Sequence, residues 1–159
     1  MLELQERHEP GPAERAWSQL LDEHATLGTR AERLEDLLAC IAEGEPPPTG
    51  WTALQEQVDA FRVELIEHLA REERDGVLEA AVAVQPRFAR RMARLRQEHM
   101  DLRSRIEGIT QRCTESPGRR DWAAVHTRFV AFRMILGDHE RAENDILQSA
   151  YLEDLGGRG

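Results

Sequence analysis

Four long segments of this chain space their apolar residues at alternating intervals of three and four positions, and this spacing limits the fold more than any other feature. Such residues form a stripe along one side of an α-helix, because about 3.6 residues make one turn. None of the segments shows the every-second-residue alternation of a half-buried strand. Each segment is therefore predicted to be an amphipathic helix that buries its stripe against the others.

Three stretches that disfavour helix separate the segments. GEPPPTG occupies residues 44–50, Pro86 marks the second boundary, and ESPGRRD occupies residues 115–121. Connections this short predict an all-α fold, an antiparallel up-down-up-down four-helix bundle. The 159 residues are expected to form one domain, with the bundle at about residues 13–154 and short flexible termini.

One histidine interrupts each apolar stripe, and two stripes also carry a glutamate four positions later. A buried carboxylate without a partner costs several kcal/mol of folding free energy. One such intrusion is most simply a satisfied polar group of the core. Six of them, spread over four helices, require a common partner. The six residues are His24, His68, Glu72, His99, His139 and Glu143.

Counting along the helices places these residues at similar heights in the bundle. His24 lies 19 residues before the expected end of its helix, and His68 lies 17 residues after the expected start of the next. The corresponding distances are about 15 residues for His99 and 18 for His139, which agree to within about one turn. In an antiparallel bundle, the six side chains can converge on one layer of the core.

Converging imidazoles and carboxylates without a thiolate suit iron, manganese or zinc. Four nitrogen ligands and two carboxylates are too many for one ordinary zinc site and match two metal ions. Each ion would take two histidines, while Glu72 and Glu143 bridge both. The spacing of four residues turns a histidine and a glutamate to one face and separates them by about one turn.

The order of these residues resembles the hemerythrin-like family, the HHE cation-binding domain. The resemblance rests on a lone histidine in the first helix, HLAREE in the second, EHMDL in the third and HERAE in the fourth, and it covers about residues 17–151. It implies a non-haem centre of two iron ions with an oxo or hydroxo bridge and open positions for dioxygen or related ligands. The ligands that it implies are His24, His68, Glu72, His99, His139 and Glu143.

One position departs from the oxygen-carrying members of that family, which place another histidine four residues after the third-helix histidine. Here the position holds Arg103, whose guanidinium cannot ligate a metal. The leading hypothesis is therefore a di-iron protein that binds or senses dioxygen, nitric oxide or iron. The second is a catalase-like oxidoreductase that decomposes peroxide, and the third is a metal-free helical interaction module. The small-molecule partner expected is a diatomic gas or a peroxide, while the sequence points to no particular protein partner.

The two halves of the chain resemble each other, since DEHATL matches QEHMDL and EHLAREE matches DHERAEN. A duplicated helical hairpin would explain the near-symmetric ligand set. A ferritin-like carboxylate bundle is the nearest competing architecture, but it uses Glu-x-x-His pairs and isolated glutamates. Here histidine precedes glutamate by four residues and the isolated ligands are histidines, so this alternative is rejected.

Other residues near the predicted ligands have simpler interpretations. Glu73 and Asp138 adjoin ligands but point off the stripe, and they are expected to be solvated, with support of a ligand as the alternative. His8 and His126 lie too far away to join the site. Gly28, one turn after the first histidine, either leaves room for an exogenous ligand or permits close helix packing. The residues expected to close the bundle ends are Trp17, Trp51 and Trp122.

The composition argues against two classes of partner. A net charge of −9 opposes general binding to nucleic acid or to anionic membranes. No run approaches about 18 apolar residues, so no membrane span is expected, and the first residues lack the apolar core of a signal peptide. Cys40 and Cys113 have no metal-binding or redox spacing. A cytoplasmic protein with free thiols is predicted.

Overall fold

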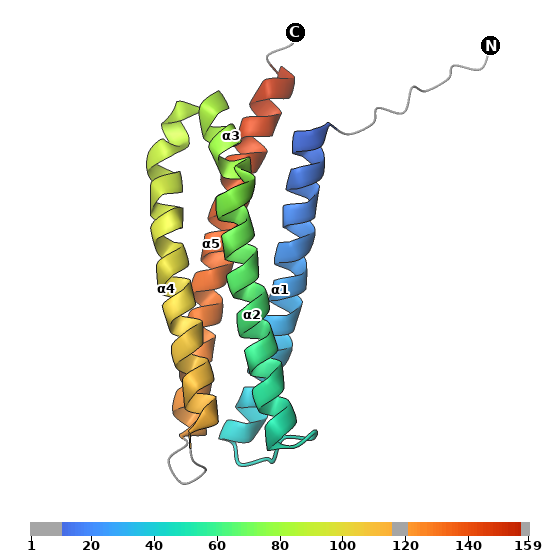
Figure 1. Ribbon diagram of the computed structural model, residues 1–159, viewed down its shortest axis with the longest axis vertical. Coiled ribbons are helices and arrows are strands. Elements are labelled where there is room, and N and C mark those ends of the chain that lie inside the picture. The colour runs from blue at the N-terminus through green and yellow to red at the C-terminus, as the bar shows by residue number, and fades with distance from the viewer. Residues whose placement is uncertain (1–10, 116–120, 157–159) are drawn as a thin grey trace, which may run out of the picture.

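The computed structural model describes residues 11–115 and 121–156, and within them the chain is helical, without a strand. His8 lies outside the described residues. The predicted all-α fold is confirmed. The elements shown in Figure 1 are α1 (Pro12–Ala42), α2 (Trp51–Asp75), α3 (Val77–Val84), the 3₁₀ turn η1 (Pro86–Phe88), α4 (Ala89–Thr114) and α5 (Trp122–Gly156).

The four long helices stand side by side as a bundle (Figure 1). Along the chain α1 descends, α2 rises, α4 descends and α5 rises, so successive long helices run in opposite directions. Both α1 and α4 pack against α2 and α5, and the short α3 packs mainly against α5. Within the described ranges, no helix has the length and hydropathy needed to cross a membrane.

The second helix is shorter than predicted. It was expected to continue to Pro86, but α2 ends at Asp75 and α3 begins at Val77. Between them Gly76 adopts φ +67° and ψ +18°, the left-handed conformation that commonly ends a helix and that glycine adopts at little cost. The prediction was wrong because apolar residues continue beyond the glycine, and their spacing hid the break.

Local chemistry explains several helix ends. Pro12 occupies the first turn of α1, where its missing N–H removes no helical hydrogen bond. The side chain of Asp121 accepts a hydrogen bond of 3.0 Å from the Ala124 N–H, which caps the start of α5. Trp51 and Trp122 begin α2 and α5, and their rings stack with centroids 5.3 Å apart at that end of the bundle.

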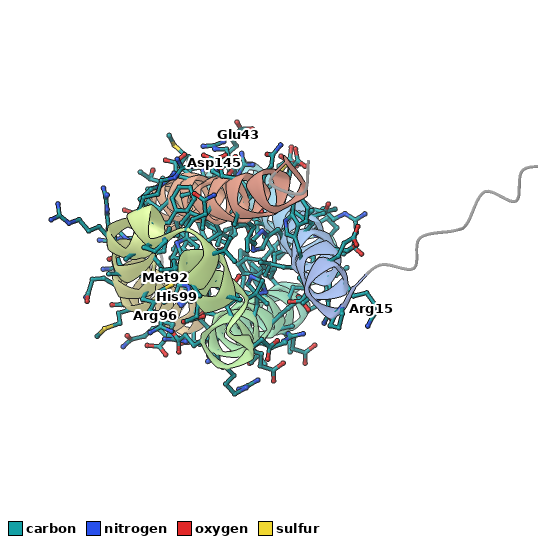
Figure 2. All side chains as sticks on the ribbon, turned by 90° about the horizontal axis from the view of Figure 1, so that it is seen from above. Arg15, Glu43, Met92, Arg96, His99 and Asp145 are labelled. Atoms are coloured by element: carbon teal, nitrogen blue, oxygen red, sulfur yellow. The ribbon has the colours of Figure 1, made fainter. Side chains whose placement is uncertain are left out.

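Two apolar clusters fill the bundle above and below a polar layer. The larger cluster includes Phe61, Phe129 and Phe132, which contact one another and are almost fully buried. The smaller cluster lies around α3, where Trp17 packs against it. Figure 2, which looks along the bundle, shows side chains filling the space between the helices. In α1, α4 and α5 the predicted ligands fall between buried residues of the two clusters, and in α2 they lie where the larger cluster ends.

Candidate metal centre

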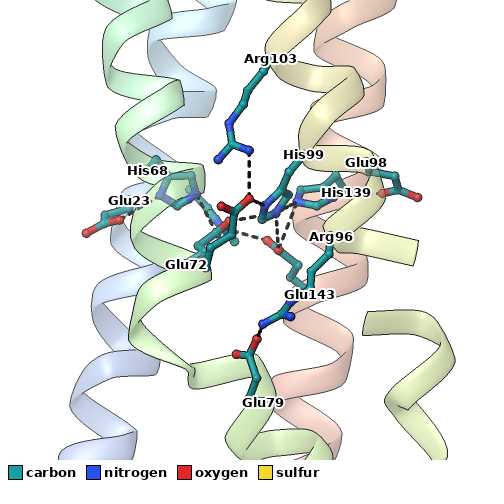
Figure 3. A network of polar contacts seen from close by, with 12 residues as sticks. Glu23, His68, Glu72, Glu79, Arg96, Glu98, His99, Arg103, His139 and Glu143 are labelled. Atoms are coloured by element: carbon teal, nitrogen blue, oxygen red, sulfur yellow. Dashed lines mark hydrogen bonds and ion pairs between the residues drawn. The ribbon is translucent and has the colours of Figure 1, made fainter. Parts of the chain in front are cut away.

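The structure brings all six predicted ligands into one buried layer of the bundle. All four long helices contribute. Figure 3 shows the side chains of His68, Glu72, His99, His139 and Glu143 turned toward a common centre. None of the six is more than 8% exposed. The group comprises His24 on α1, His68 and Glu72 on α2, His99 on α4, and His139 and Glu143 on α5.

The histidines form two pairs. The α1/α2 pair consists of His24 and His68, whose ring centroids lie 5.1 Å apart. The α4/α5 pair consists of His99 and His139, whose ring centroids lie 4.9 Å apart. The Nε2 atoms of the α4/α5 pair face each other at 3.1 Å, so both lone pairs can be directed to one point between them.

The Glu72 carboxylate divides its two oxygens between the pairs. Its Oε1 lies 3.1 Å from His24 Nε2 and 2.8 Å from His68 Nε2. Its Oε2 lies 3.4 Å from His99 Nε2. A carboxylate that bridges two metal ions requires this division.

Glu143 repeats the arrangement from the opposite side. Its Oε1 lies 3.1 Å from His139 Nε2, and its Oε2 lies 3.4 Å from His24 Nε2. The donor atoms form two overlapping groups, each within 4.8 Å, that share Glu72. One group contains the α1/α2 pair, and the other contains the α4/α5 pair together with Glu143.

The buried carboxylates show that the residues fit a cation. Glu143 is fully buried, and neither of its oxygens, nor Glu72 Oε2, has a hydrogen-bond partner among the described residues. The nearby imidazole nitrogens lie close without suitable hydrogen-bond geometry. Leaving such groups uncompensated costs several kcal/mol, and a bound cation would remove that cost. This buried cluster of histidine and glutamate therefore fits a metal site.

The same carboxylates change the proton affinity of the histidines. Burial alone would lower the pKa of His24, but the nearby carboxylates of Glu143 and Glu72 outweigh it and raise the pKa to about 10. Burial likewise opposes the charged form of His139, yet Glu143 raises its pKa to about 9. Protons therefore compete with a metal ion for these nitrogens.

A second set of glutamates, here called the outer carboxylates, binds the Nδ1 side of three of the histidines. Each accepts a hydrogen bond from a histidine Nδ1–H on the next long helix, and this bond leaves Nε2 free to donate its lone pair toward the centre. The bonds are His68 to Glu23 at 2.9 Å, His99 to Glu73 at 2.9 Å and His139 to Glu98 at 3.0 Å.

Sequence reasoning missed Glu23 and Glu98 altogether. The available signal was their position directly before a histidine in the matching DEHATL and QEHMDL segments. Glu73 is 38% exposed, as expected, but it also has the alternative role of supporting a ligand. Positions beside an apolar stripe face the neighbouring helix, and there Glu73 meets both His99 and Arg103. Asp138, by contrast, is largely exposed and pairs with Arg141, as expected for a solvated residue.

Arg103 turns away from the centre and binds an outer carboxylate. Its Nη1 lies 3.0 Å from Glu73 Oε1, the oxygen that also accepts the His99 Nδ1–H. Figure 3 shows the Arg103 guanidinium above the ring of His99. The ion pair with Arg103 is the largest cause that lowers the pKa of Glu73, so the carboxylate stays charged behind His99.

His24 differs from the other three histidines, because its buried Nδ1 has no hydrogen-bond partner in the part of the chain that the structure describes. In the same part, Asn144 Oδ1 and Glu140 Oε1 are also buried without hydrogen-bond partners. Burial raises the pKa of Glu140 to about 7, although the charges of the nearby histidines oppose this rise. A Cβ atom added at Gly28, one turn from His24, would meet nothing within 4 Å, so close helix packing does not explain this glycine.

Comparison with family models identifies the class of protein. The model described as the hemerythrin HHE cation binding domain matches residues 15–151 of this chain. The chain therefore belongs to the hemerythrin HHE cation-binding family, and the family resemblance noted from the sequence is confirmed. Searches of curated proteins and of solved structures found no match.

Proposed function

We propose that this chain holds two iron ions and uses them to bind or sense dioxygen, nitric oxide or iron itself. The observation that carries the proposal is the division of the Glu72 and Glu143 oxygens between two histidine pairs. A single metal ion needs one cluster of donors, whereas two donor groups joined by carboxylates suit two ions.

The donor set supports iron as the metal. Nitrogen and carboxylate donors without a thiolate suit iron, and the two carboxylates offset part of the charge of two cations. Iron at such a site supplies redox chemistry and open coordination positions. The protein's own residues orient and shield this chemistry, because the outer carboxylates fix three of the imidazoles and the apolar clusters exclude water. Stable oxygen carriage is not proposed, since Arg103 replaces the additional histidine of the carriers.

Decomposition of peroxide by the same centre is the second candidate. Glu140 favours it, because its Oε1 is buried without a hydrogen-bond partner among the described residues, so this carboxyl is available to exchange a proton. This carboxyl is close enough to His24 for their charges to influence each other. The proposed compartment for either function is the cytoplasm, which suits Cys40 and Cys113 because neither forms a disulfide among the described residues.

Metal analysis of protein reconstituted with iron tests the proposal. We expect two iron ions per chain, with the near-ultraviolet absorption of a bridged iron pair. His126→Ala serves as the control, because His126 belongs to neither donor group and its loss should leave the iron content unchanged. At most one iron per chain would refute the di-iron proposal. Rapid loss of added peroxide would favour the enzyme, whereas tight nitric oxide binding without peroxide turnover would favour the sensor.

A further inference from the structure

A small pocket reaches the centre at the junction of α1, α2 and α3. Its volume is about 40 Å³, and Glu72 forms part of its wall. Because one water needs about 10–15 Å³ of such space, the pocket has room for a molecule of about two or three non-hydrogen atoms. Its apolar wall consists of Ala16, Leu20, Val77 and Leu78.

The break at Gly76 explains why the pocket lies here. The helix ends three residues after Glu72, and residues on both sides of the break, Asp75 and Val77, line the pocket. In α1, the small side chain of Ala16 faces the same space. A continuous second helix, as the sequence had suggested, would not have separated these residues in this way.

The polar part of the lining includes a negative charge that the metal ions would not offset. Glu72 faces the metal ions, and Arg71 is the charged partner of Glu23, since its Nη1 donates to Glu23 Oε1 at 2.8 Å. Asp75 adds a further carboxylate. An opening with this charge balance disfavours anions and leaves neutral molecules unaffected.

A second hollow lies beside the pocket and approaches His68 from the outside. It is lined by residues that include Thr26, Glu64 and His68. Glu23 also lines it and accepts the His68 Nδ1–H, so this hollow approaches the Nδ1 side of the ring and not the Nε2 side that faces the centre. The first pocket instead reaches a carboxylate whose oxygens face both histidine pairs.

We propose that the pocket lined by Ala16, Leu20, Val77 and Glu72 is the route by which small neutral molecules reach the metal centre, and that its carboxylates slow the passage of anions. The ligand class is that of nitric oxide, dioxygen and hydrogen peroxide. This inference rests on the proposed function, because it requires a centre that binds such molecules.

Stopped-flow measurement of nitric oxide binding to the iron-loaded, reduced protein tests the route. Ala16→Trp fills the pocket and should slow association at least about tenfold, because access then requires the indole to move. Thr26→Trp is the matched control, since it places the same side chain on the same helix in the second hollow and should leave the rate unchanged. Val77→Phe narrows the same pocket from α3 and serves if Ala16→Trp fails to fold.

The readouts separate this inference from the proposed function. Iron content and the final nitrosyl spectrum test the function, and both should match the unmodified protein in all three variants. Unchanged rates in both Ala16→Trp and Val77→Phe, or slowing by Thr26→Trp instead, would overturn the route. Absence of nitric oxide binding by unmodified iron-loaded protein would overturn the proposed nitric oxide function and the route together.

Azide binding to the oxidised protein tests the charge of the opening. Asp75→Asn should speed azide association about two- to threefold at low ionic strength, with the difference shrinking as salt is added. The nitric oxide rate should stay unchanged, since that ligand is neutral. Asp59→Asn removes the same charge from the distant part of α2 and should have no effect. Equal azide rates in Asp75→Asn and unmodified protein would overturn the selection against anions.

Discussion

The α1/α2 and α4/α5 histidine pairs present similar donor atoms to the centre but differ in the hydrogen-bond partners of their Nδ1 atoms. In the α4/α5 pair, His99 and His139 both donate Nδ1–H to outer carboxylates, and Arg103 anchors one of these. In the α1/α2 pair, His68 has such a carboxylate, whereas His24 Nδ1 has no hydrogen-bond partner within residues 11–115 and 121–156. The hydrogen bonds that orient the histidines therefore differ between the two pairs.

The duplicated hairpin shows where this difference arises. Aligning EHLAREE with DHERAEN pairs Glu73 with Asn144, and aligning the DEHATL and QEHMDL segments pairs Gly28 with Arg103. The six central histidines and glutamates are thus repeated in both halves, while Asn144 and Gly28 stand where the other half has Glu73 and Arg103. A carboxylate acceptor on Nδ1 makes an imidazole a stronger ligand than one without an acceptor, so the α4/α5 position is expected to bind its iron more tightly.

Removing the carboxylate of Glu72 or Glu143 should weaken iron binding at both positions, and the difference in affinity between them should disappear. We expect Glu143→Ala to lose most of the iron from both, because its oxygens face both histidine pairs. Glu72→Ala should behave in the same way. Elemental analysis and the absorption spectrum measure the loss. Full retention of iron and spectrum by both variants would show that neither glutamate bridges.

Metal removal should lower the stability of the folded bundle, because both histidine pairs lose their bound cation. Bound metal stabilises only the folded bundle, so chelation should lower the melting temperature and added iron should restore it. An unchanged melting temperature after verified removal of the metal would favour the interaction module.

The metal-free protein should also lose stability as the pH rises. The folded-state pKa values of His24 and His139, about 10 and about 9, lie above the ordinary value of 6.5. Their protonation therefore contributes stability that is fully present below about pH 6.5 and is lost as the pH rises through about 9 to 10. Each group changes the free energy of unfolding by about 1.4 kcal/mol per pH unit within that window. A melting temperature that stays constant from pH 6 to pH 10 would contradict this prediction.

Loss of an outer carboxylate should affect one position more than the other. Glu98→Ala removes the acceptor of His139 and should weaken iron binding at the α4/α5 position by about 10–100-fold. Asn144→Ala should change iron affinity much less, because Asn144 Oδ1 has no hydrogen bond to lose. Stepwise removal of iron by a competing chelator measures both. Equal losses of iron affinity in the two variants would show that the hydrogen bond from His139 to Glu98 does not strengthen iron binding.

The convergence of the six central histidines and glutamates could be predicted because these residues contrast with their surroundings. A histidine or glutamate within an apolar stripe stands out, and the positions of the stripes along antiparallel helices place the six residues at one height. The all-α bundle followed from the same pattern. Both predictions depend on a periodicity that the backbone geometry of a helix imposes.

The outer carboxylates could not be predicted in this way, because they lie where charged residues are ordinary. Charged residues make up 32% of the chain, so apolar spacing does not separate Glu23 and Glu98 from solvated glutamates, and the sequence marks them only by their position directly before a histidine. Only the packing of one helix against the next brings them to a histidine. The pocket beside Glu72 likewise depends on the direction that α3 takes after Gly76, which apolar spacing does not encode.

Arg103 offers the finest test of the difference between the pairs. It acts on His99 only through Glu73, and both charged side chains are partly exposed, at 27% and 38%. Solvent therefore screens their attraction, and we expect Arg103→Ala to weaken iron binding at the α4/α5 position by no more than about fivefold. Arg103→Lys should recover part of the loss by restoring the charge without the planar donor group. Arg105→Ala on the same helix removes an exposed ion pair with Asp101 and should leave the iron unaffected.

The His99 Nδ1–H resonance of metal-free protein should shift in Arg103→Ala and remain in place in Arg105→Ala. Identical resonances and identical iron affinities in both variants would show that Arg103 does not position Glu73 behind His99.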